Sequence, residues 1–100
     1  MAIPWTPKLK PIEVDPDSSK DWTFDFSEFV ANEGRDVLSY EVLSSGDLQA
    51  TDDTRSGAEV SFWLTPPAEG GEGTVTVRFR LDTAPVFSDD FSIRFRGKHQ

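Results

Sequence analysis

Side chains that could carry out catalysis are scarce in this sequence and form no catalytic pattern. The single histidine, His99, is one residue from the end of the 100 residues, and there is no cysteine. Nucleophilic triads and thiolate metal sites need these residue types. We interpret His99 as a terminal residue rather than a base or ligand. We therefore expect no catalytic residues and no cofactor, and a protein that is not an enzyme.

Pairs of carboxylates are the remaining candidates for a metal site. They are Asp15/Asp17, Asp52/Asp53 and Asp89/Asp90. None follows the spaced Asp-x-Asp-x-Asp-Gly pattern of a calcium loop, so we expect no metal site. The glycine-rich stretch 70–73 lacks the Lys-Ser/Thr of a phosphate loop and carries an acid where phosphate would bind. It predicts an inter-strand loop.

Large apolar and cationic side chains predict protein contacts instead. Trp63 falls on the polar face of its predicted strand, where either residues 1–20 of the same chain or a partner covers it. Aromatic and arginine side chains in such places often anchor interfaces. The predicted contact residues are Trp5, Leu9, Ile12, Trp63, Arg78, Arg80, Val86, Phe87, Arg94 and Arg96. Val86 and Phe87 are expected in the loop of the last hairpin.

Segments with apolar side chains at every second position must hold these residues. They are 22–26, 38–42, 60–64, 75–81 and 91–95, and a weaker strand is expected near Leu48–Thr51. This alternation predicts strands with one buried face. Turn residues separate them at 32–34, 44–47, 52–57 and 66–73, and only Ser27–Ala31 is compatible with a helical turn capped by Ser27. We predict an all-β fold, a small antiparallel β-sandwich that is immunoglobulin-like.

Prolines separate the first part of the chain from the rest. Four prolines lie within residues 1–20 and favour an extended segment over a helix. We predict an extended Pro-rich N-terminal arm at 1–20, the sandwich at 21–97 and a C-terminal tail at 98–100. The apolar side chains of the arm indicate that it folds back on its own domain or lies on a neighbouring subunit.

The last two strands predict a register if a loop over 82–90 joins them. Pairing Leu81 with Phe91 puts core residues opposite each other along the whole hairpin. It also puts Arg78 opposite Arg94. Four arginines then share one outer face, where like charges are destabilising unless neutralised: Arg78, Arg80, Arg94 and Arg96. Either acidic side chains of a neighbouring strand neutralise this face, or it binds an acidic surface of a partner.

The charge of the chain excludes some partners. The net charge is −8, and the acidic excess lies on residues 21–100. Such a field repels the backbone of nucleic acids, so we expect no nucleic-acid partner. No apolar run approaches the ~18 residues of a membrane span. We expect no membrane contact and no secretory signal. The lack of cysteine suits folding in a reducing cytoplasm or stabilisation within an assembly.

Three segments carry a resemblance to a known family. The first is Val14-Asp15-Pro16-Asp17 followed by the strand Trp22–Ser27 and an Asn-Glu-Gly turn. The second is Val60–Leu64 followed by a glycine-rich loop and Thr-Val-Thr-Val, and the third is the ending Phe91–Arg96. Together they resemble the fiber-tail adaptor proteins of tailed bacteriophages, over about residues 11–97. Pro66-Pro67 and the longer proline-rich start depart from that pattern.

The resemblance implies a virion structural protein that joins tail or fibre parts. Multiple copies would act in a symmetric assembly through multivalent contacts. Its partners would be other virion proteins of the tail, fibre or capsid, and it would be synthesised in the host cytoplasm. The departures leave its position in the virion open. The alternatives are an immunoglobulin-like capsid decoration or cement protein, and a carbohydrate-binding β-sandwich module.

Overall fold

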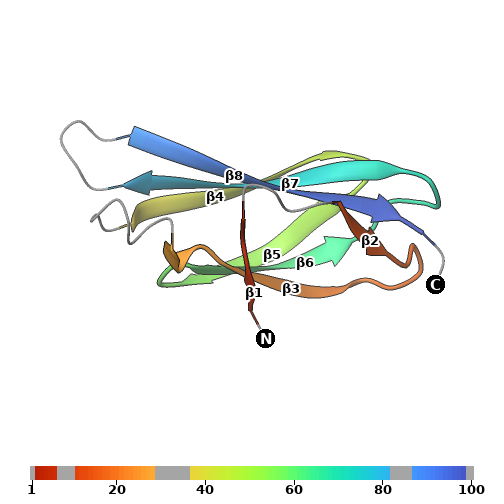
Figure 1. The fold of residues 1–100 in the computed structure, drawn as a ribbon, viewed down its shortest axis with the longest axis horizontal. Coiled ribbons are helices and arrows are strands. Elements are labelled where there is room, and N and C mark those ends of the chain that lie inside the picture. The colour runs from red at the N-terminus through yellow and green to blue at the C-terminus, as the bar shows by residue number, and fades with distance from the viewer. Residues whose placement is uncertain (1, 7–10, 29–36, 82–86, 99–100) are drawn as a thin grey trace.

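Within the described part of the chain, eight strands form two sheets that pack face to face (Figure 1). In the computed structural model the described residues are 2–6, 11–28, 37–81 and 87–98. The strands are β1 (Ile3–Pro4), β2 (Ile12–Val14), β3 (Lys20–Asp25), β4 (Val37–Gly46), β5 (Gln49–Ser56), β6 (Glu59–Thr65), β7 (Glu72–Leu81) and β8 (Phe87–Gly97). The prediction of an all-β sandwich is confirmed.

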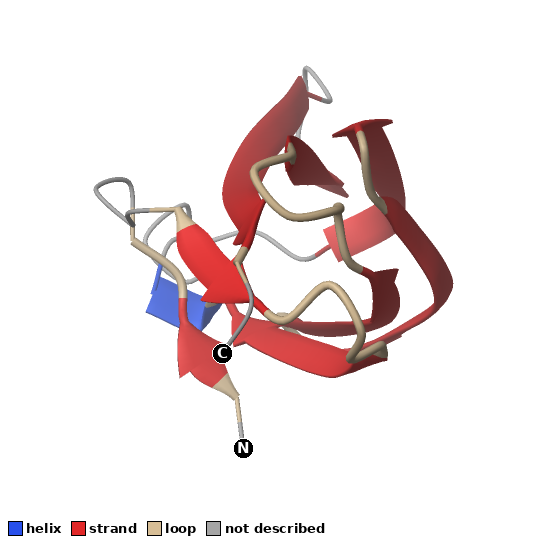
Figure 2. Ribbon diagram, turned by 90° about the vertical axis from the view of Figure 1, so that its right-hand side faces the viewer, coloured by secondary structure: helices blue, strands red, loops and turns tan. Residues whose placement is uncertain are grey.

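Both sheets are mixed, so the prediction of a purely antiparallel sandwich is wrong. Sheet A has the order β1-β3-β6-β5, and sheet B has the order β2-β8-β7-β4; Figure 2 shows them as two layers seen end-on. β1 pairs in parallel with β3, and β2 pairs in parallel with β8. All other pairs are antiparallel. The N-terminal segment adds one short edge strand to each sheet, and no hairpin turn forces these strands to run antiparallel.

The core follows the predicted alternation. Along β6, Val60, Phe62 and Leu64 are buried, and the residues between them are more exposed. The phenylalanine rings of the two sheets meet in the middle, with Phe62 stacked on Phe24 and edge-on to Phe95 at centroid distances of 6.0 and 6.3 Å. Burying each such ring contributes about 1.5–3 kcal/mol, so these inner faces account for much of the stability.

Trp5 closes one edge of the sandwich. Its ring lies edge-on to Phe91 at 4.9 Å and 6.0 Å from Phe26. Its Nε1 donates a hydrogen bond to the Ser92 carbonyl of β8, and its backbone N–H donates to the Asp25 carbonyl of β3. Trp5 therefore links sheet A to sheet B. The described apolar residues Ile3, Trp5 and Ile12 of the N-terminal segment thus pack against the core of their own chain.

The register of the last hairpin differs from the predicted one by four residues. Leu81 pairs with Phe87 and Val77 with Phe91, and β8 already begins at Phe87. Phe87 is therefore part of a strand and not of a loop, while Val86 lies outside the described residues. A shift by an even number keeps every side chain on its predicted face, because the period of a strand is two. The hydrophobic pattern alone favours the predicted register, because the observed one places Asp89 opposite the buried Phe79.

The predicted break at 52–57 is also wrong. The weak sixth strand exists as β5, but it continues through Asp52 and Asp53 with an irregularity between Thr51 and Thr54. Asp52 has φ = 53°, a left-handed conformation that Asp adopts more easily than most residues. The turn to β6 is shorter than predicted and contains Gly57 at φ = 61°.

The predicted helical turn is present at its start. Ser27 and Glu28 are helical, and residues 29–31 lie outside the described ranges. The carboxylate of Asp25 accepts a hydrogen bond of 2.8 Å from the Ser27 backbone N–H. Asp25 therefore forms an Asx turn that leads into the helical turn, in which Ser27 is already helical.

Candidate contact faces

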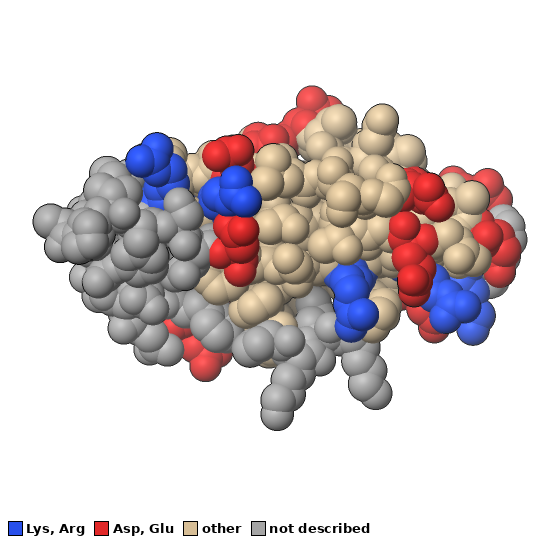
Figure 3. Space-filling view, turned by 90° about the horizontal axis from the view of Figure 1, so that it is seen from above, with Lys and Arg blue, Asp and Glu red and all other residues tan. Residues whose placement is uncertain are grey.

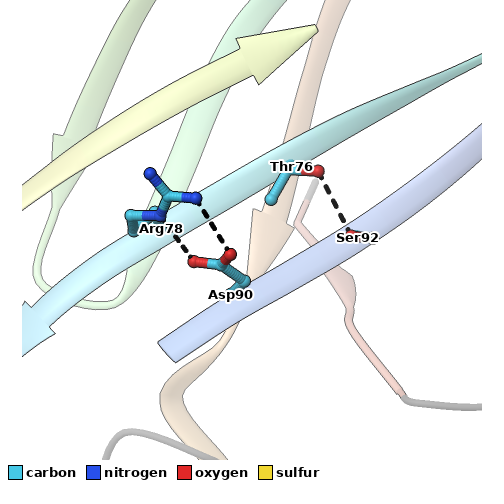
Figure 4. Close-up of polar contacts among 4 residues, drawn as sticks. All are labelled: Thr76, Arg78, Asp90 and Ser92. Atoms are coloured by element: carbon cyan, nitrogen blue, oxygen red, sulfur yellow. Dashed lines mark hydrogen bonds and ion pairs between the residues drawn. The ribbon is translucent and has the colours of Figure 1, made fainter. Parts of the chain in front are cut away.

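The outer face of sheet B carries the four predicted arginines. Arg78 binds Asp90 of β8 in a bidentate ion pair, with Nε–Oδ1 at 2.8 Å and Nη2–Oδ2 at 3.1 Å (Figure 4). This hydrogen bonding raises the pKa of Arg78 and lowers the pKa of Asp90. Glu41 of β4 is the register partner of Arg78 on the other side. Acids of the neighbouring strands thus neutralise Arg78, as one of the two sequence-based alternatives proposed.

The other arginines occupy separate rows of the sheet. Arg96 is the register partner of Glu72 on β7 and of Glu13 on β2. Arg94 is opposite Thr74, and Arg80 has Ser88 and Ser39 as its register partners. The predicted opposition of Arg78 and Arg94 is therefore wrong, because the four-residue shift gives each arginine a different neighbour. Figure 3 views this face and shows basic and acidic side chains interspersed on it.

An uncharged row separates the charged ones. Thr76 and Ser92 are register partners, and their hydroxyl oxygens are 3.2 Å apart, next to the Arg78–Asp90 pair (Figure 4). Leu43 of β4 completes this row and is 38% exposed. The face of sheet B is thus a set of cross-strand pairs rather than a basic patch.

The outer face of sheet A holds Trp63. Its side chain is 39% exposed, although its chain neighbours Phe62 and Leu64 are 1% exposed. The predicted placement of Trp63 on the polar face is confirmed, and Trp5 and Ile12, two described apolar residues of the N-terminal segment, pack against the core instead of covering it. Trp63 stands between Asp21 of β3 and Thr51 of β5 in the register of the sheet.

Hydroxyls and carboxylates surround Trp63. In the next row, the hydroxyl oxygens of Thr23 and Ser61 lie 2.7 Å apart. In the row beyond, Asp25 pairs with Glu59. The described outer-face positions of β3, β5 and β6 include no lysine or arginine. Trp63 is therefore a large apolar side chain on a face with charge of one sign.

Two hollows mark the surface elsewhere. A hollow of about 330 Å³ lies where β2 turns into β3 and is lined by Glu13, Val14, Asp15, Ser18, Lys20 and Trp22. A smaller one of about 200 Å³ is lined by Ser45, Gly46, Glu72, Gly73, Thr74 and Arg94. Across the part of the chain that the structure describes, no three His, Asp or Glu side chains gather as a metal site.

The sequence pattern does not predict which residues pair with the predicted contact residues. It predicts Asp90 only as half of an acidic pair and gives Asp21 no role. The available signal was the parity of the strand, because Asp90 alternates with Phe91 and so shares a face with Arg94 and Arg96. Among the predicted contact residues, Leu9 lies outside the described ranges, and Ile12 packs against the core from β2.

Comparison with known proteins adds no relative. No protein-family model matches the chain, and no curated protein matches it significantly. In the described ranges no helix has the length and apolar character needed to cross a membrane.

Proposed function

We propose that this chain is a bacteriophage virion structural protein, an adaptor that joins tail or fibre components through protein contacts. The observation that carries the proposal is Trp63, a tryptophan 39% exposed on a sheet whose other face is the core. The family resemblance at 11–97 supplies the virion as the setting. Multiple copies in a symmetric assembly would make weak single contacts sufficient.

Trp63 has the properties of an interface anchor. It lies on β6, which is flanked by β3 and β5, so its backbone is held on both sides. A partner that covers it would bury a large ring without first ordering a loop. Truncating such a tryptophan at an interface typically costs about 2 kcal/mol or more, because tryptophans are enriched among the residues that dominate binding energy.

The strand order supports the immunoglobulin-like part of the proposal. When β1 to β8 are lettered A, A′, B, C, D, E, F and G, sheet A has the order A-B-E-D and sheet B has the order A′-G-F-C. Immunoglobulin domains pair an ABED sheet with a CFG sheet. The inter-sheet disulfide of antibody domains has no counterpart, since the chain has no cysteine.

Incorporation into particles tests the proposal. We expect the chain in purified virions of the phage that encodes it, and we expect Trp63→Ser to reduce its copy number at least about tenfold, a loss of 1.4 kcal/mol or more. Quantitative mass spectrometry of the particles measures both. Leu43→Ser is the matched control, because Leu43 is equally exposed on the opposite sheet. Absence of the wild-type chain from particles contradicts the proposal.

A carbohydrate-binding module is the second candidate. A sugar ring can stack on an exposed indole while a neighbouring carboxylate accepts hydrogen bonds, and Trp63 with Asp21 offers both groups. A glycan array separates the candidates, since glycan binding that Trp63→Ser abolishes favours the module. A capsid decoration protein would use the same kind of contact, and immunogold labelling of head or tail distinguishes it from an adaptor.

A further inference from the structure

The two outer faces of the sandwich differ in how their charges are paired. On sheet B, Arg78 binds Asp90, and Arg96 is flanked by two acids in register. On sheet A, the acids Asp21, Asp25 and Glu59 share the outer face with no lysine or arginine among its described positions. No described Lys or Arg forms an ion pair with these three carboxylates. The Asp25 carboxylate accepts the Ser27 backbone N–H, whereas Asp21 and Glu59 are exposed and their charge faces solvent.

Trp63 and Asp21 form the centre of this face. They are directly opposite each other on antiparallel strands, which places their Cβ atoms about 4.5–5.5 Å apart. A cation stacked on the indole therefore lies within reach of the Asp21 carboxylate. The nearest basic residue of β3, Lys20, is engaged elsewhere, with its Nζ 5.0 Å from the ring centroid of Trp22.

We propose that the outer face of sheet A binds a cationic protein segment, with a partner arginine stacked on Trp63 and paired with Asp21. This deepens the proposed function and rests on its premise that Trp63 is a contact residue. Arginine fits better than lysine, because its planar guanidinium stacks on an aromatic ring and donates to a carboxylate at the same time. Asp25 and Glu59 would contribute longer-range attraction to further positive charges.

A second copy of this chain is the competing occupant. Its exposed arginines Arg80 and Arg94 have hydroxyl residues as their register partners. However, they lie on a face where the other two arginines alternate with acids, so that face lacks the single sign of charge that would complement sheet A. The charges therefore favour a different, basic partner.

A peptide titration tests the proposal on the full chain. Hexa-arginine amide is added to ¹⁵N-labelled protein at physiological salt, and hexa-lysine amide serves as the charge-matched probe. We expect shift changes at the Trp63 indole and in β3 and β6, and tighter binding of the arginine peptide. We expect Trp63→Ser to weaken binding about tenfold and Asp21→Asn about threefold to tenfold, as removal of a cation–π contact and of an ion-pair partner would.

The control variants change residues on the outer face of sheet B. Leu43→Ser removes an equally exposed apolar side chain, and Glu41→Gln removes one negative charge from the outer face of β4. Both should leave the affinity within about twofold, because exposed charges farther apart than the ~8 Å Debye length are largely screened. Equal weakening by Glu41→Gln and Asp21→Asn would show attraction by net charge alone and overturn the proposal.

Two further outcomes also overturn it. Shift changes confined to sheet B would place the peptide elsewhere, and a wild-type dimer in sedimentation that Trp63→Ser abolishes would identify a second copy as the occupant. The result is separable from the proposed function. If particle incorporation needs Trp63 while the peptide does not, the adaptor role stands and the cationic partner is rejected. If the peptide binds at Trp63 but particles lack the chain, the cationic-ligand proposal stands and the adaptor role is rejected.

Discussion

The outer faces of sheet A and sheet B belong to one sandwich but use their polar residues differently. Sheet B forms charged pairs within itself, and the best defined is Arg78 with Asp90. Sheet A pairs hydroxyl with hydroxyl at Thr23 and Ser61, and leaves Asp21, Glu59 and Trp63 exposed to solvent. The comparison teaches that charge on a sheet can specify which strand residues pair, or can be presented to a partner.

On sheet B the charges help to determine the register. The predicted and observed registers of β7 and β8 place the same side chains on the same faces, but the observed one sets Asp89 opposite the core residue Phe79, so the apolar pattern does not select it. They differ in the neighbours of the arginines. The observed register replaces an Arg78–Arg94 opposition with an Arg78–Asp90 pair, and opposite charges across strands are favoured over like charges.

The largest effect should come from comparing the two faces of β6. Phe62→Ala removes a ring that is 1% exposed and should cost about 3–5 kcal/mol of unfolding free energy. Trp63→Ser, one residue along, should cost less, about 1–2 kcal/mol, because its ring is 39% exposed and points away from the core. Chemical denaturation measures both. Similar losses in the two variants would show that Trp63 is a structural residue, not a contact residue.

The next largest effect tests the N-terminal segment that adds a strand to each sheet. Trp5→Ala removes two ring contacts and the hydrogen bond to Ser92, and should cost about 2–3 kcal/mol, less than a fully buried Trp. Trp5→Phe, which retains an aromatic ring, should lose less unfolding free energy than Trp5→Ala. Hydrogen exchange should then show faster opening of β1 and β2 in Trp5→Ala. Unchanged stability would contradict the role of Trp5 as the link between the sheets.

A smaller effect tests the charge pairing of sheet B. Arg78→Glu places an acid between Asp90 and Glu41, and should lower the Tm by a few degrees because like charges then face each other. Adding Asp90→Lys to Arg78→Glu should restore most of the lost Tm, because the acidic and basic side chains of the pair then exchange positions and attract each other again. Thermal unfolding followed by circular dichroism measures the series. Failure of the double variant to recover would show that the pair does not contribute to the register.

The smallest effect is a pH dependence specific to sheet B. The Arg78 hydrogen bonds hold the pKa of Asp90 below its usual 3.8. The stability from this pair is therefore fully present above pH 3.8 and is lost as the pH falls through the lower pKa of the folded state. As the pH falls below 3.8, the unfolding free energy of Asp90→Asn should decrease less than that of the wild type. Arg78→Gln, which removes the hydrogen bonds to the Asp90 carboxylate, should show the same smaller loss as Asp90→Asn.

Much of the fold was determined by the sequence alone. Alternation of apolar and polar residues identified the strands and their buried faces, and it placed Trp63 outward and Phe62 inward. These are local properties, since the side-chain direction in a strand follows from its period of two. The absence of cysteine and the single histidine likewise limited the chemistry that any fold of this chain could carry.

Tertiary structure decided which residues meet. Periodicity fixes a face but not a register, so the partner of Arg78 became known only when β7 and β8 were paired. Periodicity also could not show that β1 and β2 join different sheets, or that Asp52 and Asp53 continue a strand through a bulge. Those outcomes depend on contacts between segments distant in the chain. The acidic face around Trp63 arises in the same way, because β3, β5 and β6 supply its residues from three separate stretches.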